Sequence, residues 1–208
     1  MLVCLLNKGA HALDLSSSLT VVLAQIINPI SDRKCEYFAQ GAMVIKNEKI
    51  IDIGNKSKVF KKLKGKEFQI VDYSTQVIIP SFFDMHFHWV QDDVREMPKA
   101  NLLDWLNNYT FPAERKFQNK SYAKKKAKFF FNRLASVGTL GGACFSSIHE
   151  HALEEAHKHS IGNFIIGNVL MTMNSPKYLT QTHEDAIETV KKYSKNYKEK
   201  YALTPRFA

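Results

Sequence analysis

Cysteine is scarce in this sequence of 208 residues, which contains only Cys4, Cys35 and Cys144. The three are widely spaced, and no CxxC pair is present. Both a disulfide framework and a zinc site built from thiolates are therefore disfavoured. We expect the protein to act in the reducing cytoplasm.

Long hydrophobic runs are also missing. No stretch reaches the roughly 18 uncharged apolar residues of a membrane-spanning helix, so we predict no membrane segment. The apolar start, Met1–Leu6, has no basic residues before it and no clean small-residue cleavage site after it, which argues against a secretory signal. What is present is an ordinary globular composition, with 45% hydrophobic and 24% charged residues.

Acidic residues are fewer than basic ones. The sequence has 29 Lys and Arg and 20 Asp and Glu, which give a net charge of +9. The excess lies in lysine-rich runs within residues 61–66, 124–128 and 191–200. Such runs form either a phosphate-binding surface or solvated helix faces. Arginines are rare in them, and aromatic side chains do not alternate with the lysines as a nucleic-acid stacking surface requires. We therefore favour solvated faces and predict no nucleic-acid partner.

The hydrophobic pattern changes near Pro80. Short apolar runs before it predict strands, including a hairpin of Gly41–Ile45 with Lys49–Ile53. After it, apolar runs alternate with longer helical stretches, which predicts an α/β fold with parallel βα units. We expect a poorly ordered leader over 1–19, a β-rich part over 20–80 and the α/β part over 81–208. The remaining predicted strands are Thr20–Ile27, Phe68–Val71, Gln76–Ile79, Phe82–His88, Thr139–Ser147, Asn163–Met171 and Tyr201–Phe207, and the helices include Lys120–Val137, His151–His159 and Glu184–Tyr197.

The segment Val77–His88, VIIPSFFDMHFH, contains the main chemical signal. His86 and His88 are two residues apart on a predicted strand, so both imidazoles should lie on the same face. Two neutral imidazoles on one face suit Zn²⁺, with Fe²⁺ as the alternative. At the carboxyl end of a first barrel strand they would lie where barrel active sites are built.

This segment resembles the PGFxDxHxH motif of the amidohydrolase superfamily, and three further segments are similar to guanine deaminases. The resemblance implies a partial (β/α)₈ TIM-like barrel, with about the first four βα units in residues 81–208, preceded by the β-rich part of a composite β-sandwich. It also implies zinc-dependent hydrolytic deamination of guanine to xanthine and ammonia, and a homodimer in the full-length form. The three segments are Leu102–Leu106 with Tyr109–Glu114, Val169–Met171 with Asn174–Pro176, and Thr204–Phe207.

The same resemblance assigns roles to five residues. His86 and His88 would bind the metal, while Gln91, Arg206 and Phe207 would contact guanine. These residue types suit the base, because a guanidinium can donate to O6 and N7, an amide can both donate and accept, and a ring can cover a base face. The family's remaining metal ligands and its proton-shuttling glutamate follow the Thr204–Phe207 segment, so we expect no proton-shuttle residue in these 208 residues. We expect little or no turnover by this chain alone.

Two alternatives stay open. The first is an amidohydrolase that acts on another aminopurine or on a cyclic amidine, and the second is an inactive fragment or a non-enzymatic binding protein. Of the six further histidines, His11 and His183 are expected at the surface, and four have no assigned role. His149 ends a predicted strand and could line the pocket, His151 begins a His-x-x-Glu with Glu154, and His157 and His159 are expected on an outer helix.

Overall fold

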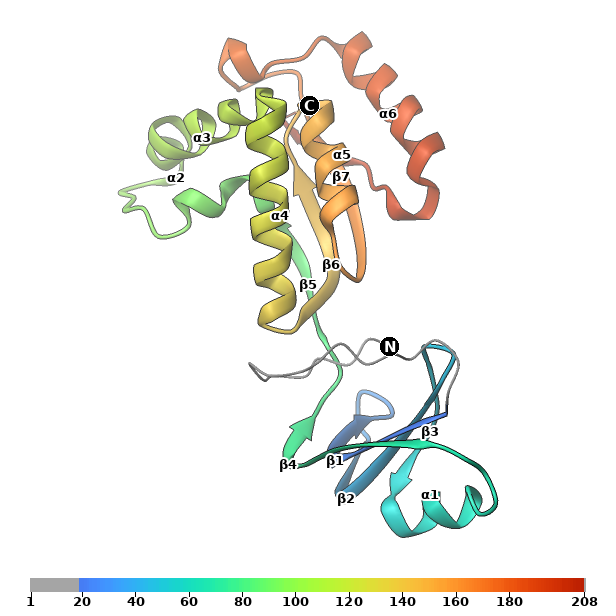
Figure 1. Ribbon diagram of the computed structural model, residues 1–208. Helices are drawn as coiled ribbons and strands as arrows, with labels where there is room; N and C mark the ends of the chain where they lie inside the picture. Colours follow the sequence, from blue (N-terminus) through green and yellow to red (C-terminus); the bar gives the residue numbers. More distant parts are fainter. Residues whose placement is uncertain (1–18, 208) are drawn as a thin grey trace. The chain divides into compact units, whose positions relative to one another are not determined.

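The computed structural model describes residues 19–207, which fall into two compact units divided between Ser81 and Phe82 (Figure 1). The predicted leader, residue 19 apart, lies outside the described residues. Among the described residues, no helix is both long enough and apolar enough to cross a lipid bilayer.

The first unit contains a four-stranded sheet in the order β3-β2-β1-β4. The predicted hairpin is confirmed, because β2 and β3 pair antiparallel and Asn47 and Glu48 turn the chain with φ of 49° and 61°. The predicted strands 68–71 and 76–79 form one strand, β4, which runs parallel to β1. The bounds are β1 Thr20–Pro29, β2 Cys35–Lys46, β3 Lys49–Asn55, α1 Lys56–Lys62 and β4 Gln69–Ile78.

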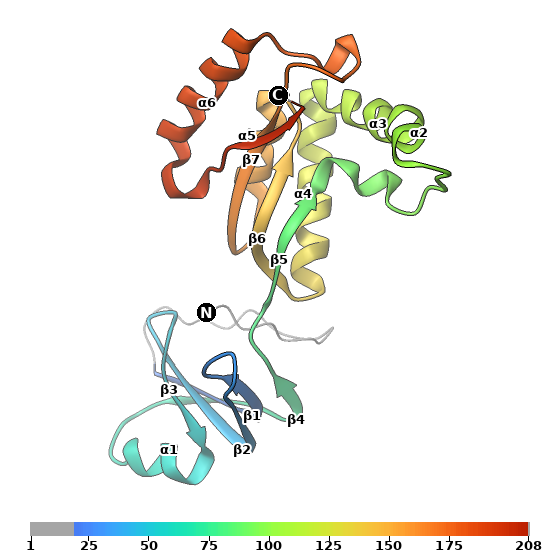
Figure 2. The same cartoon turned by 180° about the vertical axis from the view of Figure 1, so that it is seen from behind.

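The second unit contains a parallel sheet in the order β5-β6-β7-β8, which confirms the predicted mixed α/β character. Helices α4 and α5 lie side by side on one face of this sheet (Figure 1), and the strands are in front of these helices when seen from behind (Figure 2). The bounds are β5 Phe82–His88, α2 Leu102–Trp105, α3 Phe111–Arg115, α4 Lys120–Ser136, β6 Thr139–Ser146, α5 Glu150–His159, β7 Asn163–Met171, α6 His183–Tyr197 and β8 Thr204–Phe207, with a 3₁₀ helix at Trp89–Val94 and a π-helical turn at Leu106–Thr110.

Local sequence signals set the limits of α4. The Asn119 side chain accepts a hydrogen bond from the Tyr122 backbone N–H and caps the first turn. Gly138 adopts φ of 82° just after the last turn, as predicted for a helix that stops at a glycine. Beneath α4 and α5, Trp89 is buried, and its indole Nε1 donates to Ser146 Oγ at 3.0 Å. This bond joins the carboxyl ends of β5 and β6.

The packing of α5 on α6 predicts a pH-dependent stability. The His157 ring stacks on Tyr197 at 3.6 Å, and burial lowers its pKa to about 4, with a further lowering from Lys200 and an opposing hydrogen bond to the Ile166 backbone. Because the unfolded imidazole has a pKa near 6.5, the unfolded chain binds more protons between these values. The stabilising contribution is complete above about pH 6.5 and is lost as the pH falls toward 4.

We therefore expect the urea midpoint of the second unit to fall between pH 7.5 and 5, and His157→Gln to reduce this fall. Tryptophan fluorescence measures the transition, since Trp89 and Trp105 are the two tryptophans of the sequence and both lie in this unit. The comparison at pH 7.5 separates loss of packing from titration. An identical pH dependence in both proteins would contradict the assignment.

Candidate functional site

The two histidines of β5 share one aromatic neighbour. The ring of Phe145, on β6, stacks with His86 at 4.5 Å and with His88 at 4.7 Å between ring centroids. The two imidazole centroids are 5.4 Å apart. The alternation of a strand thus brings both rings to the same side, at the carboxyl ends of β5 and β6.

His88 is the more buried of the pair. Its Nδ1 is buried and has no hydrogen-bond partner among the described residues. Burial lowers the pKa of His88 to about 4, and the nearby positive charges of Arg206 and His86 lower it further. The imidazole is therefore neutral near pH 7, which is the form that binds a metal ion.

The geometry of this pair fits a zinc ion. Zn–N bonds of about 2.0–2.1 Å at a tetrahedral angle would place two imidazole centres about 5 Å apart, close to the separation observed here. The Nδ1 atom of His88 has no hydrogen-bond partner in the described part of the chain, so its lone pair is available to a metal ion. Within residues 19–207, however, no three His, Cys, Asp or Glu side chains are grouped for metal binding. The described residues therefore offer two candidate ligands for a metal ion.

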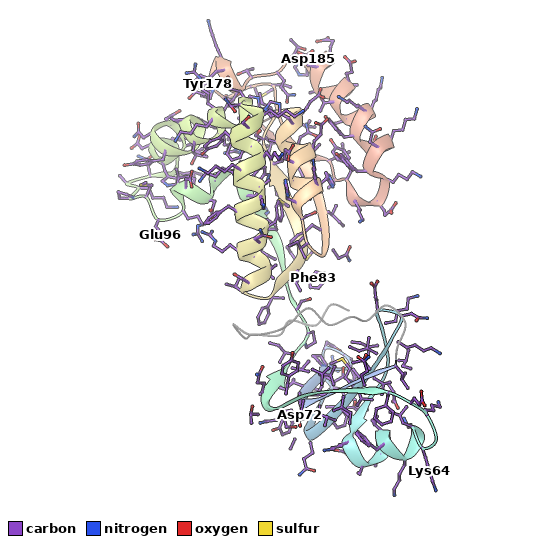
Figure 3. The ribbon with its side chains drawn as sticks, in the orientation of Figure 1. Lys64, Asp72, Phe83, Glu96, Tyr178 and Asp185 are labelled. Carbon is purple, nitrogen blue, oxygen red and sulfur yellow. The ribbon has the colours of Figure 1, made fainter. Side chains whose placement is uncertain are left out.

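The position of β5 depends on a close approach to β6. Gly142 has φ of 142°, and a Cβ atom there would lie 1.8 Å from the backbone oxygen of Asp84. At Gly141 a Cβ would meet the ring of Phe83, which is labelled near the amino end of β5 in Figure 3. The two glycines let the strands that carry Asp84 and Phe145 lie against each other.

A buried carboxylate joins the predicted base-binding residues. Glu114 on α3 is 0% exposed and accepts hydrogen bonds from Gln91 Nε2 at 2.8 Å and from Arg206 Nη1 at 2.7 and 2.9 Å. Gln91 belongs to the 3₁₀ helix that follows β5, and Arg206 belongs to β8. The fold thus brings these two side chains together from opposite ends of the second unit's sequence.

Phe207 lies beside this cluster. Its ring meets Phe111 edge to face at 6.2 Å, and the Arg206 guanidinium lies 5.3 Å from the Phe207 ring and 5.7 Å from that of Phe111. Phe207 packs against the buried group of Leu106, Phe111, Val169, Met171 and Leu179. The ring is only partly buried, so part of its surface remains accessible.

A pocket of about 550 Å³ opens beside the histidines, and His86, His88, Gln91 and Trp105 are among the residues that line it. Its size suits a small ligand. Three cationic side chains, Arg95, Lys99 and Arg133, also border it, and Asp92 pairs with two of them, Arg95 and Arg133.

The four histidines between residues 149 and 159 lie away from this pocket. His149 precedes α5 and faces the ring of His151 at 6.1 Å, while His151 Nε2 lies 2.6 Å from the backbone oxygen of Phe117. His157 and His159 are on α5, as predicted, and His159 lies near Glu155. None of the four lines the pocket beside His86 and His88.

Sequence reasoning missed Glu114 and Phe145 as parts of this site. Glu114 stood inside a distinctive sequence block, but nothing local identified its partners. A sharper signal was available for Phe145, because it occupies on β6 the place that pairs with His88 on β5. Aromatic residues on neighbouring strands of a parallel sheet are natural neighbours for a histidine pair.

Several known proteins are similar to this chain in sequence. No family model matches the chain. The guanine deaminase of Escherichia coli (strain K12) is 36% identical over 147 residues, which make up 67% of this chain and 34% of the relative. Human guanine deaminase is 29% identical over 147 residues, or 64% of this chain and 32% of the relative. The chain therefore spans about a third of the length of these curated relatives.

Solved structures match a larger part of the chain. The guanine deaminase from C. acetobutylicum, solved with guanine bound in its active site, superposes with a TM-score of 0.81 and 30% identity, over 91% of this chain and 46% of that one. An adenosine deaminase from Xanthomonas campestris with bound zinc matches with a TM-score of 0.70 over 92% of this chain and 43% of that one. At 10% identity the second match shows a common fold alone.

Proposed function

Since the chain is homologous to guanine deaminases and has the fold of the amidohydrolase family, we propose that it supplies metal-binding and base-binding residues for the zinc-dependent deamination of guanine to xanthine and ammonia. The single observation that carries this proposal is the meeting of Gln91 and Arg206 on Glu114, in the same unit as the histidine pair of β5. The parallel sheet β5–β8 would then be the first half of a (β/α)₈ barrel, and the first unit a part of a β-sandwich.

Arg206 and Gln91 have the groups that guanine requires. Arg206 uses Nη1 for Glu114, and its Nε and Nη2 make no hydrogen bond to the described residues. These N–H groups suit the O6 and N7 acceptors of guanine. Phe207, next to Arg206, offers an aromatic surface on which a base can stack.

His86 and His88 would hold the metal ion, with Zn²⁺ preferred over Fe²⁺. When bound, such an ion supplies Lewis acidity and lowers the pKa of water. In the overall reaction water adds to the carbon that bears the exocyclic amine, the C–N bond breaks, and ammonia leaves with the transferred protons. We do not assign proton transfer to Glu114, because its two oxygens already accept hydrogen bonds from Arg206 and Gln91.

We also propose that the protein acts in the cytoplasm and that its full-length form is a homodimer. The cytoplasmic location rests on the scarcity of cysteine in the sequence. The homodimer rests on the resemblance to guanine deaminases.

The proposal predicts that the purified chain retains zinc and binds guanine saturably. Guanine binding is measured by the fluorescence of Trp105, which lines the pocket, and zinc by elemental analysis. His88→Ala removes one of the two ligands and is expected to lower the zinc content at least about tenfold. His183→Ala, on an exposed histidine at the start of α6, is the matched control.

A wild-type chain that shows no saturable guanine binding would contradict the proposed function. Preferential binding of another aminopurine or of a cyclic amidine would favour the alternative substrate class. Equal zinc content in His88→Ala and in the control would contradict the metal assignment.

A further inference from the structure

Glu114 has the burial and the contacts of a residue that organises its neighbours. It is fully buried, and the Arg206 side chain that pairs with it is only 11% exposed. Its partners come from two different elements, the 3₁₀ helix after β5 and the strand β8. A carboxylate in this place fixes both partners in low dielectric surroundings, where hydrogen bonds to a charged group are strong.

The contact with Gln91 fixes the orientation of its amide. An ionised carboxylate can only accept hydrogen bonds, so Gln91 must turn its NH₂ group toward Glu114. The amide oxygen of Gln91 is then the group left to meet a ligand in the pocket that Gln91 lines. A ligand on this side must therefore offer an N–H group.

The contact with Arg206 fixes the hydrogen-bond donors of the site, as the contact with Gln91 fixes the acceptor. Arg206 Nη1 donates to both oxygens of Glu114, and the planar guanidinium is held by this contact. Arg206 does not itself line the pocket, but the shared Glu114 carboxylate holds it next to Gln91. A base bound at this edge of the pocket would therefore meet N–H donors from Arg206 and an acceptor from Gln91. Guanine matches this arrangement, because it offers the acceptors O6 and N7 together with N–H groups, whereas adenine offers a donor, N6, beside N7.

We propose that Glu114 is a positioning residue that sets the donor and acceptor pattern of the base-binding site and so selects an oxo-purine such as guanine over an amino-purine such as adenine. This inference rests on the proposed function. Glu114 itself touches neither substrate nor metal in this scheme. It acts through Gln91 and Arg206.

The test compares guanine and adenine binding in Glu114→Gln. A glutamine at 114 can donate as well as accept, so the Gln91 amide is free to turn over and the guanidinium loses its charged partner. We expect guanine affinity to fall about tenfold or more, the magnitude of a lost hydrogen bond to a charged group. The preference for guanine over adenine should fall with it.

Two further variants keep this test decisive. Glu155→Gln is the matched control, because Glu155 is a buried glutamate on α5 that contacts neither Gln91 nor Arg206, and it should bind guanine as the wild type does. Gln91→Met removes the amide but keeps the ion pair of Glu114 with Arg206. It should also lose the preference for guanine, even if Glu114→Gln folds poorly.

An NMR measurement on the ligand-free chain distinguishes the inference about Glu114 from the proposed function. In ¹⁵N NMR spectra of the ligand-free chain, the Arg206 side chain should give distinct, slowly rotating guanidinium signals that disappear in Glu114→Gln. Loss of these signals with unchanged guanine preference would overturn the inference and leave the proposed function standing. Signals that persist in Glu114→Gln would also overturn it, and a wild type that binds neither purine would overturn both proposals.

Discussion

Replacing Arg206 by alanine is expected to lower the free energy of unfolding of the second unit by about 3–5 kcal/mol. The reason is the burial of Glu114, which is 0% exposed and would lose its only charged partner among the described residues. The remaining hydrogen bond from Gln91 satisfies one oxygen only. Urea denaturation followed by tryptophan fluorescence measures the loss, because both tryptophans lie in this unit.

Two variants control this experiment. Arg95→Ala breaks the ion pair with Asp92, but the Arg95 side chain is 57% exposed, so a loss of at most about 1 kcal/mol is expected. The double variant Glu114→Gln with Arg206→Met removes both charges and should recover much of the stability lost in Arg206→Ala. If Arg206→Ala and Arg95→Ala cost the same, Glu114 does not depend on Arg206 for its burial.

The second large effect is expected at Gly142. An alanine there would have to adopt φ of 142° and would place its Cβ 1.8 Å from the backbone oxygen of Asp84. Because the obstacle is backbone rather than a flexible side chain, β5 must move away from β6. We expect a loss of about 3 kcal/mol or more, the sum of backbone strain and steric conflict, measured by the thermal transition in circular dichroism.

Gly65→Ala provides the matched control. Gly65 also has positive φ, 80°, but a Cβ there would meet no atom within 4 Å. The Gly65→Ala variant is therefore expected to lose only the cost of the left-handed conformation, about 1–2 kcal/mol, because no atom of the described residues clashes with the new Cβ. Equal losses at Gly65 and Gly142 would show that β5 and β6 can separate freely, and that the close approach does not position the histidine pair.

The sequence predicted the histidine pair more directly than it predicted the cluster around Glu114. The DxHxH segment predicted two imidazoles on one face, because side-chain direction along a strand alternates with a fixed period. The structure brings the five predicted site residues into one unit, with Gln91 and Arg206 on a shared carboxylate and Phe207 beside them. Their roles in binding zinc and guanine are the proposals tested above.

Sequence by itself determined what depends on neighbouring residues. It set strand β7 at Asn163–Met171, the stop of α4 before Gly138 and the hairpin of β2 with β3, because periodicity, caps and turns act over a few residues. Tertiary structure alone decided the contacts of Glu114, whose partners are 23 and 92 residues away along the chain. A buried ion pair forms only when folding removes water from both charges, and no local pattern encodes which distant elements will meet.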